Sequence, residues 1–134
     1  MTKKIKIKDH IWEWGKRTYI MGILNITPDS FSDGGRFIHH DAAIQHALQM
    51  CEAGVDIIDI GGESTRPGAS PVTVDEEIQR VVPLIQLLND KISVPISVDT
   101  YRARTAQMTL DAGAAMINDV WGLKADPEMA PLVG

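Results

Sequence analysis

Short polar side chains end four aliphatic stretches of this sequence. They are Asn25, Asp59, Asp99 and Asn118. Carboxylates accept hydrogen bonds and carboxamides both donate and accept them, so such residues can bind a polar ligand. If the stretches are parallel strands, their carboxyl ends meet at the edge of the sheet where α/β folds bind ligands. A helix cap or a turn is an equally good interpretation for any one of them, but the fourfold recurrence favours a shared polar site.

The connection after the first stretch, residues 25–35, reads NITPDSFSDGG and is longer than a hairpin turn requires. Asn25, Asp29 and Asp33 carry hard oxygen ligands of the kind that Mg²⁺ accepts beside phosphate. The alternative is an ordinary turn at residues 27–30 followed by two permissive glycines. Because loops of this length usually serve a function, the sequence favours a mobile lid over a ligand.

The connection after the second stretch, residues 61–70, reads GGESTRPGAS. Its two leading glycines allow the backbone to approach a ligand closely. Arg66 offers a planar, permanently charged fork that suits phosphate or carboxylate. An ordinary salt bridge between Glu63 and Arg66 is the alternative, and the sequence leaves it open.

Alternating strand and helix patterns are expected to position these loops. Near-continuous apolar runs are typical of parallel strands buried on both faces, and they span residues 17–25, 55–60, 94–99 and 114–119. Apolar residues recur at helical spacing between these runs. The expected helix N-caps are Asp41, Thr73, Thr100 and Asp126, and Asp126 precedes a proline that suits the first helical position.

An internal repeat supports this alternation and indicates its size. Residues 52–60 (EAGVDIIDI) and 111–119 (DAGAAMIND) share an acid-Ala-Gly helix end followed by an apolar strand. Two βα units separate them, so each unit takes roughly 30 residues and eight units would take about 240, the usual size of a (β/α)₈ barrel. The sequence therefore predicts an α/β fold of the (β/α)₈ TIM-barrel family, with residues 17–134 supplying about four βα units, the last helix truncated.

Residues 1–16 are expected to form a short β-ribbon that precedes these units. Two strand-like pieces, at 3–8 and about 11–14, can pair, and Gly15 and Lys16 suit a turn. Lysines alternate with isoleucines in the first piece, which is the pattern of an exposed strand. We expect the ribbon to lie at the N-terminal end of the barrel.

Composition excludes several classes of protein. The formal net charge of −5 argues against a general nucleic-acid binder. No apolar run is long enough to cross a membrane, and no signal-peptide pattern is present. Cys51 is the only cysteine, which excludes an internal disulfide and fits a reducing compartment. These features predict a cytoplasmic protein that binds neither nucleic acid nor membrane.

Four motifs carry a family resemblance. MGILNITPDSFSDGG and DIIDIGGESTRPGA, followed by SVDT and MINDV at these spacings, resemble the dihydropteroate synthases of bacterial folate synthesis. The resemblance implies a pterin-binding barrel that condenses 6-hydroxymethyl-7,8-dihydropterin pyrophosphate with p-aminobenzoate and releases pyrophosphate. It also implies a Mg²⁺ cofactor and an enzyme that sulfonamide drugs target.

The resemblance assigns a role to each matching residue. Asn25 and Asp33 resemble the residues that hold Mg²⁺ and pyrophosphate. Thr65 and Arg66 belong to the loop that closes over pyrophosphate. The residues similar to those of the p-aminobenzoate pocket are Phe31, Ser64 and Pro67. Asp99 resembles the carboxylate that accepts hydrogen bonds from the pterin, and Asn118 resembles the amide that both donates to it and accepts from it. A carboxylate facing the pterin also delocalises the positive charge that develops as pyrophosphate leaves.

Other family motifs would lie past residue 134: a second pterin-binding Asp, a Lys and an Arg-x-His motif. A half-barrel leaves two edge strands and part of its core open. We therefore expect the isolated chain to be a homodimer or poorly folded, and to lack measurable synthase activity. Size-exclusion chromatography and a turnover assay against a protein-free blank test these two expectations.

Two other functions stay open. One is a pterin-dependent methyltransferase of the same barrel family, which would need no pyrophosphate and would bind a methylated folate without Mg²⁺. The other is a non-catalytic half-barrel that binds pterin or only self-associates.

Overall fold

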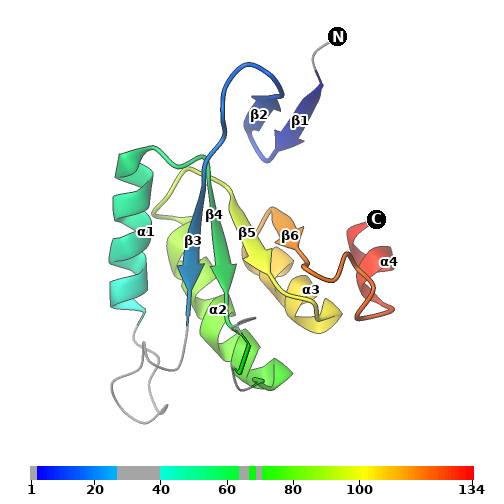
Figure 1. The fold of residues 1–134 in the computed structure, drawn as a ribbon. Coiled ribbons are helices and arrows are strands. Elements are labelled where there is room, and N and C mark those ends of the chain that lie inside the picture. The colour runs from blue at the N-terminus through cyan, green and yellow to red at the C-terminus, as the bar shows by residue number, and fades with distance from the viewer. Residues whose placement is uncertain (1–2, 27–39, 64–66, 69–70) are drawn as a thin grey trace.

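The computed structural model describes residues 3–26, 40–63, 67–68 and 71–134. Its main sheet has four parallel strands in chain order. These are β3 (Met21–Asn25), β4 (Ile57–Gly61), β5 (Ile96–Asp99) and β6 (Met116–Asn118). Helices α1 (Asp41–Ala53), α2 (Val74–Asn89) and α3 (Ala103–Ala112) connect them, and α4 (Met129–Val133) follows β6 (Figure 1). The predicted alternation of strands and helices is confirmed.

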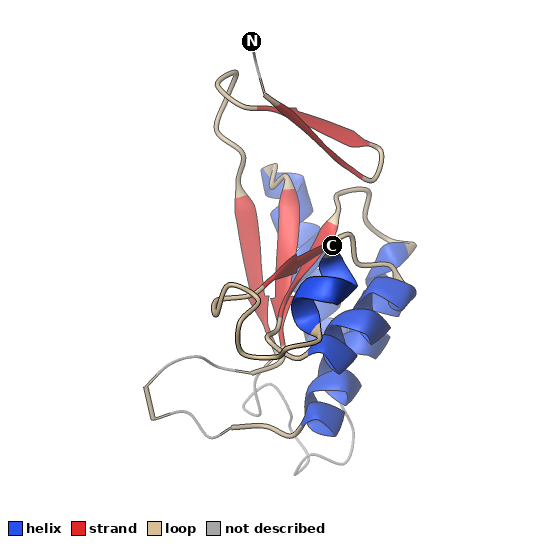
Figure 2. Ribbon diagram, turned by 90° about the vertical axis from the view of Figure 1, so that its right-hand side faces the viewer, coloured by secondary structure: helices blue, strands red, loops and turns tan. Residues whose placement is uncertain are grey.

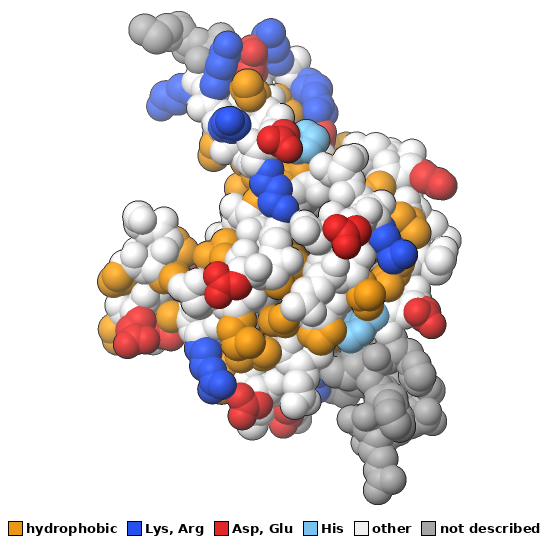
Figure 3. Space-filling view, turned by 180° about the vertical axis from the view of Figure 1, so that it is seen from behind, with side chains coloured by type: hydrophobic (Ala, Val, Ile, Leu, Met, Phe, Trp, Pro, Cys, Tyr) orange, Lys and Arg blue, Asp and Glu red, His pale blue; other side chains and the backbone are white. Residues whose placement is uncertain are grey.

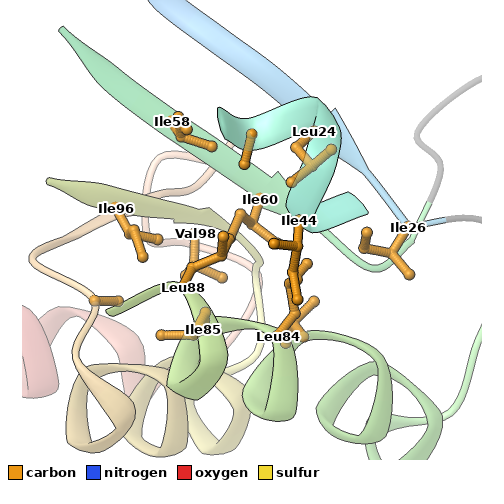
Figure 4. Close-up of a cluster of buried hydrophobic side chains, with 13 residues drawn as sticks. Leu24, Ile26, Ile44, Ile58, Ile60, Leu84, Ile85, Leu88, Ile96 and Val98 are labelled. Carbon is orange, nitrogen blue, oxygen red and sulfur yellow. The ribbon is translucent and has the colours of Figure 1, made fainter. Parts of the chain in front are cut away.

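The three connecting helices cover one face of the sheet (Figure 2). The hydrophobic core lies between that face and the helices, chiefly α2 (Figure 4). The strands contribute Leu24, Ile58, Ile60, Ile96 and Val98, and α2 contributes Val81, Leu84, Ile85 and Leu88. All of these side chains are at most 4 % exposed. By contrast, Met21 and Ile23 of the edge strand β3 point to the opposite face and are 39 % and 51 % exposed.

The start of α2 is fixed by the predicted N-cap. Thr73 has an extended backbone, and its Oγ1 accepts a hydrogen bond from the Glu76 amide at 3.1 Å. The Thr73 carbonyl accepts from the Glu77 amide at 3.0 Å. The Glu77 bond is the first regular hydrogen bond of the helix, whereas the Glu76 amide would lack a partner without the Thr73 hydroxyl.

Replacing Thr73 by alanine is expected to lower the free energy of unfolding by about 1 kcal/mol, because the Glu76 amide loses its side-chain acceptor. Urea denaturation measures this loss. Thr73→Ser is the matched control, since it keeps the hydroxyl, and it should retain most of the stability. Equal losses in both variants would show that the hydroxyl does not cap the helix.

The other three predicted caps were wrong. Asp41 is already the first residue of α1, and His40 occupies the N-cap position. The third helix begins at Ala103, and Thr100 Oγ1 accepts instead from the Arg102 amide just before it. The Ala103 amide donates to Asp126, whose carboxylate also accepts from the Glu128 amide. Asp126 therefore caps a helix that lies 23 residues earlier, and α4 begins only at Met129. These hydrogen bonds hold the β6–α4 connection against α3.

The predicted ribbon is confirmed as an antiparallel hairpin of β1 (Lys4–Ile7) and β2 (His10–Glu13). It lies at the end of the sheet where the parallel strands begin (Figure 1). Lys8 Nζ donates to Asn89 Oδ1 at 3.2 Å and to the Gly113 carbonyl. These acceptors lie at the carboxyl ends of α2 and α3, where a positive charge is favourable.

Figure 3 shows Lys and Arg side chains gathered around this hairpin. Among the described residues, no helix is long and apolar enough to cross a membrane.

Candidate active site at the carboxyl end of the sheet

Three of the four predicted strand-end residues lie in one row across the sheet. Asn25 pairs with Gly61, Gly61 with Asp99, and Asp99 with Asn118. Paired positions of neighbouring strands project to the same face, so the three polar side chains share the face opposite the helices. They lie at the carboxyl ends of the strands, the edge where α/β folds bind ligands.

Gly61 makes this row possible. A Cβ atom on Gly61 would lie 3.2 Å from Asn25 Oδ1 and 3.6 Å from Asp99 Cβ. A side chain here would therefore crowd the Asn25 amide oxygen and touch Asp99. The glycine leaves bare backbone between a carboxamide and a carboxylate, which gives a flat ligand access to both.

The fourth predicted residue, Asp59, lies elsewhere than expected. The strand β4 continues to Gly61, so Asp59 is two residues before its end and is 3 % exposed. The Ser97 hydroxyl donates to Asp59 Oδ1, and Asn118 Nδ2 donates to Asp59 Oδ2 at 3.2 Å. Asp59 thus fixes the orientation of the Asn118 amide and leaves Asn118 Oδ1 as an acceptor for a ligand.

Ser97 is a residue that the sequence analysis missed. A serine inside an apolar strand gives a weak signal, but the period of two in ISVD places Ser97 and Asp99 on the same face. Its hydroxyl is fully buried against Asp59. Every buried side-chain nitrogen and oxygen among the described residues has a hydrogen-bond partner, so this polar layer is internally satisfied.

The Asp99 carboxyl has a pKa well above its ordinary value. Burial raises its pKa to about 6, and the negative charges of Asp59, Glu77, Asp119 and Glu63 add to this effect. Perturbed carboxyl groups of this kind are concentrated at functional sites. Asp99 is therefore ionised at pH 7 but in surroundings that resist its charge, so a ligand that donates hydrogen bonds or carries positive charge would be favoured.

The raised pKa of Asp99 makes the stability of the folded chain depend on pH. Because the folded-state pKa lies above the ordinary value of 3.8, the folded chain binds a proton more tightly than the unfolded chain between pH 4 and pH 6. The contribution of Asp99 to the free energy of unfolding therefore falls across this range, by on the order of 2 kcal/mol. Above pH 6 it stays constant.

Urea denaturation from pH 4 to pH 8, with Asp99→Asn as the comparison, measures this contribution. Carboxyl groups with a lowered pKa change the stability in the opposite direction as pH rises. The Arg17 guanidinium, for example, lowers the pKa of Asp56. The difference between the two proteins isolates Asp99. The variant should gain stability relative to the parent as pH rises from 4 to 6, and parallel curves would contradict the raised pKa.

The remaining predicted site residues belong to the two long loops. Pro67 is exposed in the β4–α2 connection. Six others lie outside the described residues: Asp29, Phe31, Asp33, Ser64, Thr65 and Arg66. The alternative pairing of Glu63 with Arg66 is therefore untested, although Glu63 has a partner in Arg102 at 2.8 Å.

The described part of the site is rich in hydrogen-bond acceptors and negative in charge. Asp99 and the Asn118 carbonyl oxygen can accept from N–H groups at one edge of a planar heterocycle. Asn25 is exposed and offers a further hard oxygen at the same edge of the sheet. Such a site can bind a polar ring that donates hydrogen bonds, with a metal-bound anion beside it.

Comparison with known families identifies this arrangement. The family model described as "pterin binding enzyme" matches residues 21–134. The chain belongs to the pterin-binding enzyme family. The row from Asn25 to Asn118 lies wholly within the matched region, whereas the hairpin precedes it.

Relatives of this member of the pterin-binding enzyme family include the dihydropteroate synthase of Clostridium beijerinckii. It is 53% identical over 126 residues, which cover 94% of this chain and 47% of the relative. The dihydropteroate synthase of Clostridium difficile, crystallised in the presence of pteroic acid, is 60% identical with a TM-score of 0.84 and is matched over 90% of this chain and 46% of its own.

The Xanthomonas albilineans dihydropteroate synthase with 4-aminobenzoic acid is 44% identical with a TM-score of 0.87. The match covers 99% of this chain and 48% of that one. The chain thus spans about half the length of the relatives that it matches. The predicted barrel family is confirmed, and the four parallel strands correspond to half of a (β/α)₈ barrel.

Proposed function

We propose that this chain supplies the pterin-facing half of a dihydropteroate synthase active site. The reaction joins 6-hydroxymethyl-7,8-dihydropterin pyrophosphate to p-aminobenzoate and releases pyrophosphate. The observation that carries the proposal is the row of Asn25, Asp99 and Asn118 at one strand level, within the region that matches the pterin-binding family.

Asp99 and Asn118 bind the pterin in this proposal. The Asp99 carboxylate accepts from ring N–H groups, and Asn118 Oδ1 accepts a further hydrogen bond because Asp59 holds the Asn118 amide nitrogen. As the C–O bond to pyrophosphate breaks, positive charge develops on the pterin. A partly desolvated carboxylate at that position stabilises this charge more strongly than water does. The aromatic amine is already nucleophilic, so no strong general base is required.

Mg²⁺ is the cofactor implied, and Asn25 with Asp33 would hold it. When bound, the ion neutralises charge on the leaving pyrophosphate. The residues fit this role: Mg²⁺ beside phosphate takes only one or two protein oxygens, and Asn25 offers an exposed one at the strand end. No group of three or more His, Cys, Asp or Glu suited to a metal ion occurs among the described residues, so a site built only from protein ligands is not indicated there.

The two long loops complete the proposal. Thr65 and Arg66 contact pyrophosphate, and Phe31, Ser64 and Pro67 surround p-aminobenzoate. Sulfonamides, which resemble p-aminobenzoate, are expected to compete for that pocket. We further propose that the enzyme is cytoplasmic and homodimeric.

Titration calorimetry of pterin pyrophosphate with and without Mg²⁺ tests the proposal. The best protein is a chimera in which this chain replaces the matching segment of the Clostridium beijerinckii dihydropteroate synthase, hereafter the chimeric enzyme. We expect binding that Mg²⁺ strengthens and that Asp99→Asn weakens. Binding of a methylated folate without any effect of Mg²⁺ would favour the methyltransferase. Pterin binding that neither Mg²⁺ nor pyrophosphate affects would favour a non-catalytic half-barrel.

A further inference from the structure

Residues 62–73 connect β4 to α2, and segment 63–72 within this connection carries Arg66 in its sequence. Its two ends are held by one side chain. Arg102 Nη1 lies 2.8 Å from Glu63 Oε2, and Arg102 Nη2 donates to the Val72 carbonyl at 2.6 Å. Glu63 is the first residue of the segment and Val72 the last. A single guanidinium therefore spans the base of the connection.

The Arg102 side chain is itself fixed in place. It is 19 % exposed, and its Nη1 also donates to Glu77 Oε1 of α2 at 3.1 Å. Glu77 is 1 % exposed at its side chain and accepts from the Thr105 hydroxyl at 2.6 Å. A second anchor comes from Tyr101, whose hydroxyl donates to Glu63 and accepts from Arg102 Nη2 at 2.9 Å.

Only the branched guanidinium group of arginine can contact Glu63, Glu77 and Val72 at once. Its planar group presents several N–H donors in fixed directions and so reaches carboxylates and a carbonyl together. A lysine ammonium keeps the charge but is a single point, and it cannot reach Glu63, Glu77 and Val72 in the same geometry. By contrast, the nearby Arg104 makes an exposed pair with Asp75 at 3.5 Å and contacts neither end of the segment.

We propose that Arg102 is a positioning residue that fixes Glu63 and Val72, the two residues that flank the proposed pyrophosphate-binding loop, relative to each other. What the loop binds rests on the proposed function; the fastening does not. Arg102 makes no contact with substrate in this proposal and acts through Glu63 and Val72.

Amide hydrogen exchange in this chain tests the fastening without any ligand. The Glu76 and Glu77 amides donate to Thr73, next to Val72, and report on that end of the segment. In Arg102→Gln they should exchange at least roughly tenfold faster, because the carbonyl before them loses its anchor. The Ile92 amide, which donates to Leu88 beyond the other end of α2, should not change.

Arg104→Gln is the matched control, since it removes one positive charge two residues away, and its exchange should equal that of the parent. If Arg102→Gln fails to fold, exchange is measured in Arg102→Lys instead, because lysine keeps a positive charge beside the buried Glu77 carboxylate. Exchange at Glu76 and Glu77 no faster in the Arg102 variants than in Arg104→Gln would overturn the proposal.

A second readout separates positioning from mere stability. In the chimeric enzyme at matched thermal stability, Arg102→Lys should raise KM for pterin pyrophosphate by about tenfold and KM for p-aminobenzoate much less. Equal changes in both constants would contradict a role at the pyrophosphate loop. If exchange responds to Arg102 but the chimeric enzyme carrying the parent sequence has no turnover, the fastening stands and the proposed function fails.

Discussion

Replacing Asp99 by asparagine should lower kcat/KM of the chimeric enzyme for pterin pyrophosphate by roughly 10²- to 10³-fold, the usual cost of removing one electrostatic stabiliser of a transition state. Asparagine matches aspartate in shape but carries no charge. The variant therefore loses stabilisation of the positive charge that develops on the pterin, while its fold is kept. Because Asp99 is destabilised by burial and by its acidic neighbours, the variant should be at least as stable as the parent at pH 8.

Steady-state kinetics and urea denaturation together measure these two effects. Asp111→Asn is the matched control, because Asp111 lies exposed on α3 and bonds only to Gln107 among the described residues. It should leave kcat/KM unchanged. A loss of less than about fivefold in Asp99→Asn would show that the carboxylate does not stabilise the reacting pterin.

Truncating Ile60 to alanine should lower the free energy of unfolding of the chain by about 3–4 kcal/mol. Ile60 is fully buried in the core between the sheet and α2 (Figure 4). Its removal loses apolar contacts and leaves a cavity. Ile23, on the edge strand β3 and on the opposite face, is 51 % exposed, and Ile23→Ala should cost less than about 1 kcal/mol in a monomer of the same chain.

The same pair of variants behaves differently in the chimeric enzyme. There a further strand and the rest of the barrel interior are expected to cover β3, so the cost of Ile23→Ala should rise toward that of Ile60→Ala. Thermal and urea denaturation of both proteins provide the comparison. A large cost of Ile23→Ala in the chain alone would mean that this face is already covered, as it would be in a homodimer of half-barrels.

Local patterns in the sequence predicted the sheet and its connecting helices well. Strands buried on both faces have near-continuous apolar runs, and β4 and β5 are such strands. Thr73 was predicted as a cap because Thr73 and Glu76 have the spacing of a capping box, and Thr73 Oγ1 does accept from the Glu76 amide. Signals of this kind depend only on residues that are close in the sequence, so they can be recognised without knowledge of the tertiary structure.

Contacts between distant residues could not be predicted in this way. Asp126 looks like the cap of the helix that follows it, but its carboxylate is used by the Ala103 amide of another helix. Arg102 lies at an ordinary helix start, and only the packing of α3 beside α2 brings it to Glu63 and Val72. Both depend on how the βα units pack, which no local pattern specifies.

In the candidate site, too, local patterns predicted the strand-end residues but not the contacts between distant residues. The polar residues Asn25, Asp99 and Asn118 were found because each ends a strand, and the sheet register brings them to one level. Asp59 was placed at the strand end as well, because its carboxylate interrupts the apolar run in the sequence. In the structure β4 continues to Gly61. Its burial gives it a different task, which is to orient Asn118.

Turnover of pterin pyrophosphate and p-aminobenzoate by the chimeric enzyme is the most direct test of the function proposed for these residues. We predict formation of dihydropteroate and pyrophosphate that requires Mg²⁺, that is lost in Asp99→Asn and that is retained in Asp111→Asn. The isolated chain should remain at the level of a protein-free blank. A folded chimeric enzyme without turnover, beside an active Clostridium beijerinckii parent, would contradict the assignment of this half of the active site.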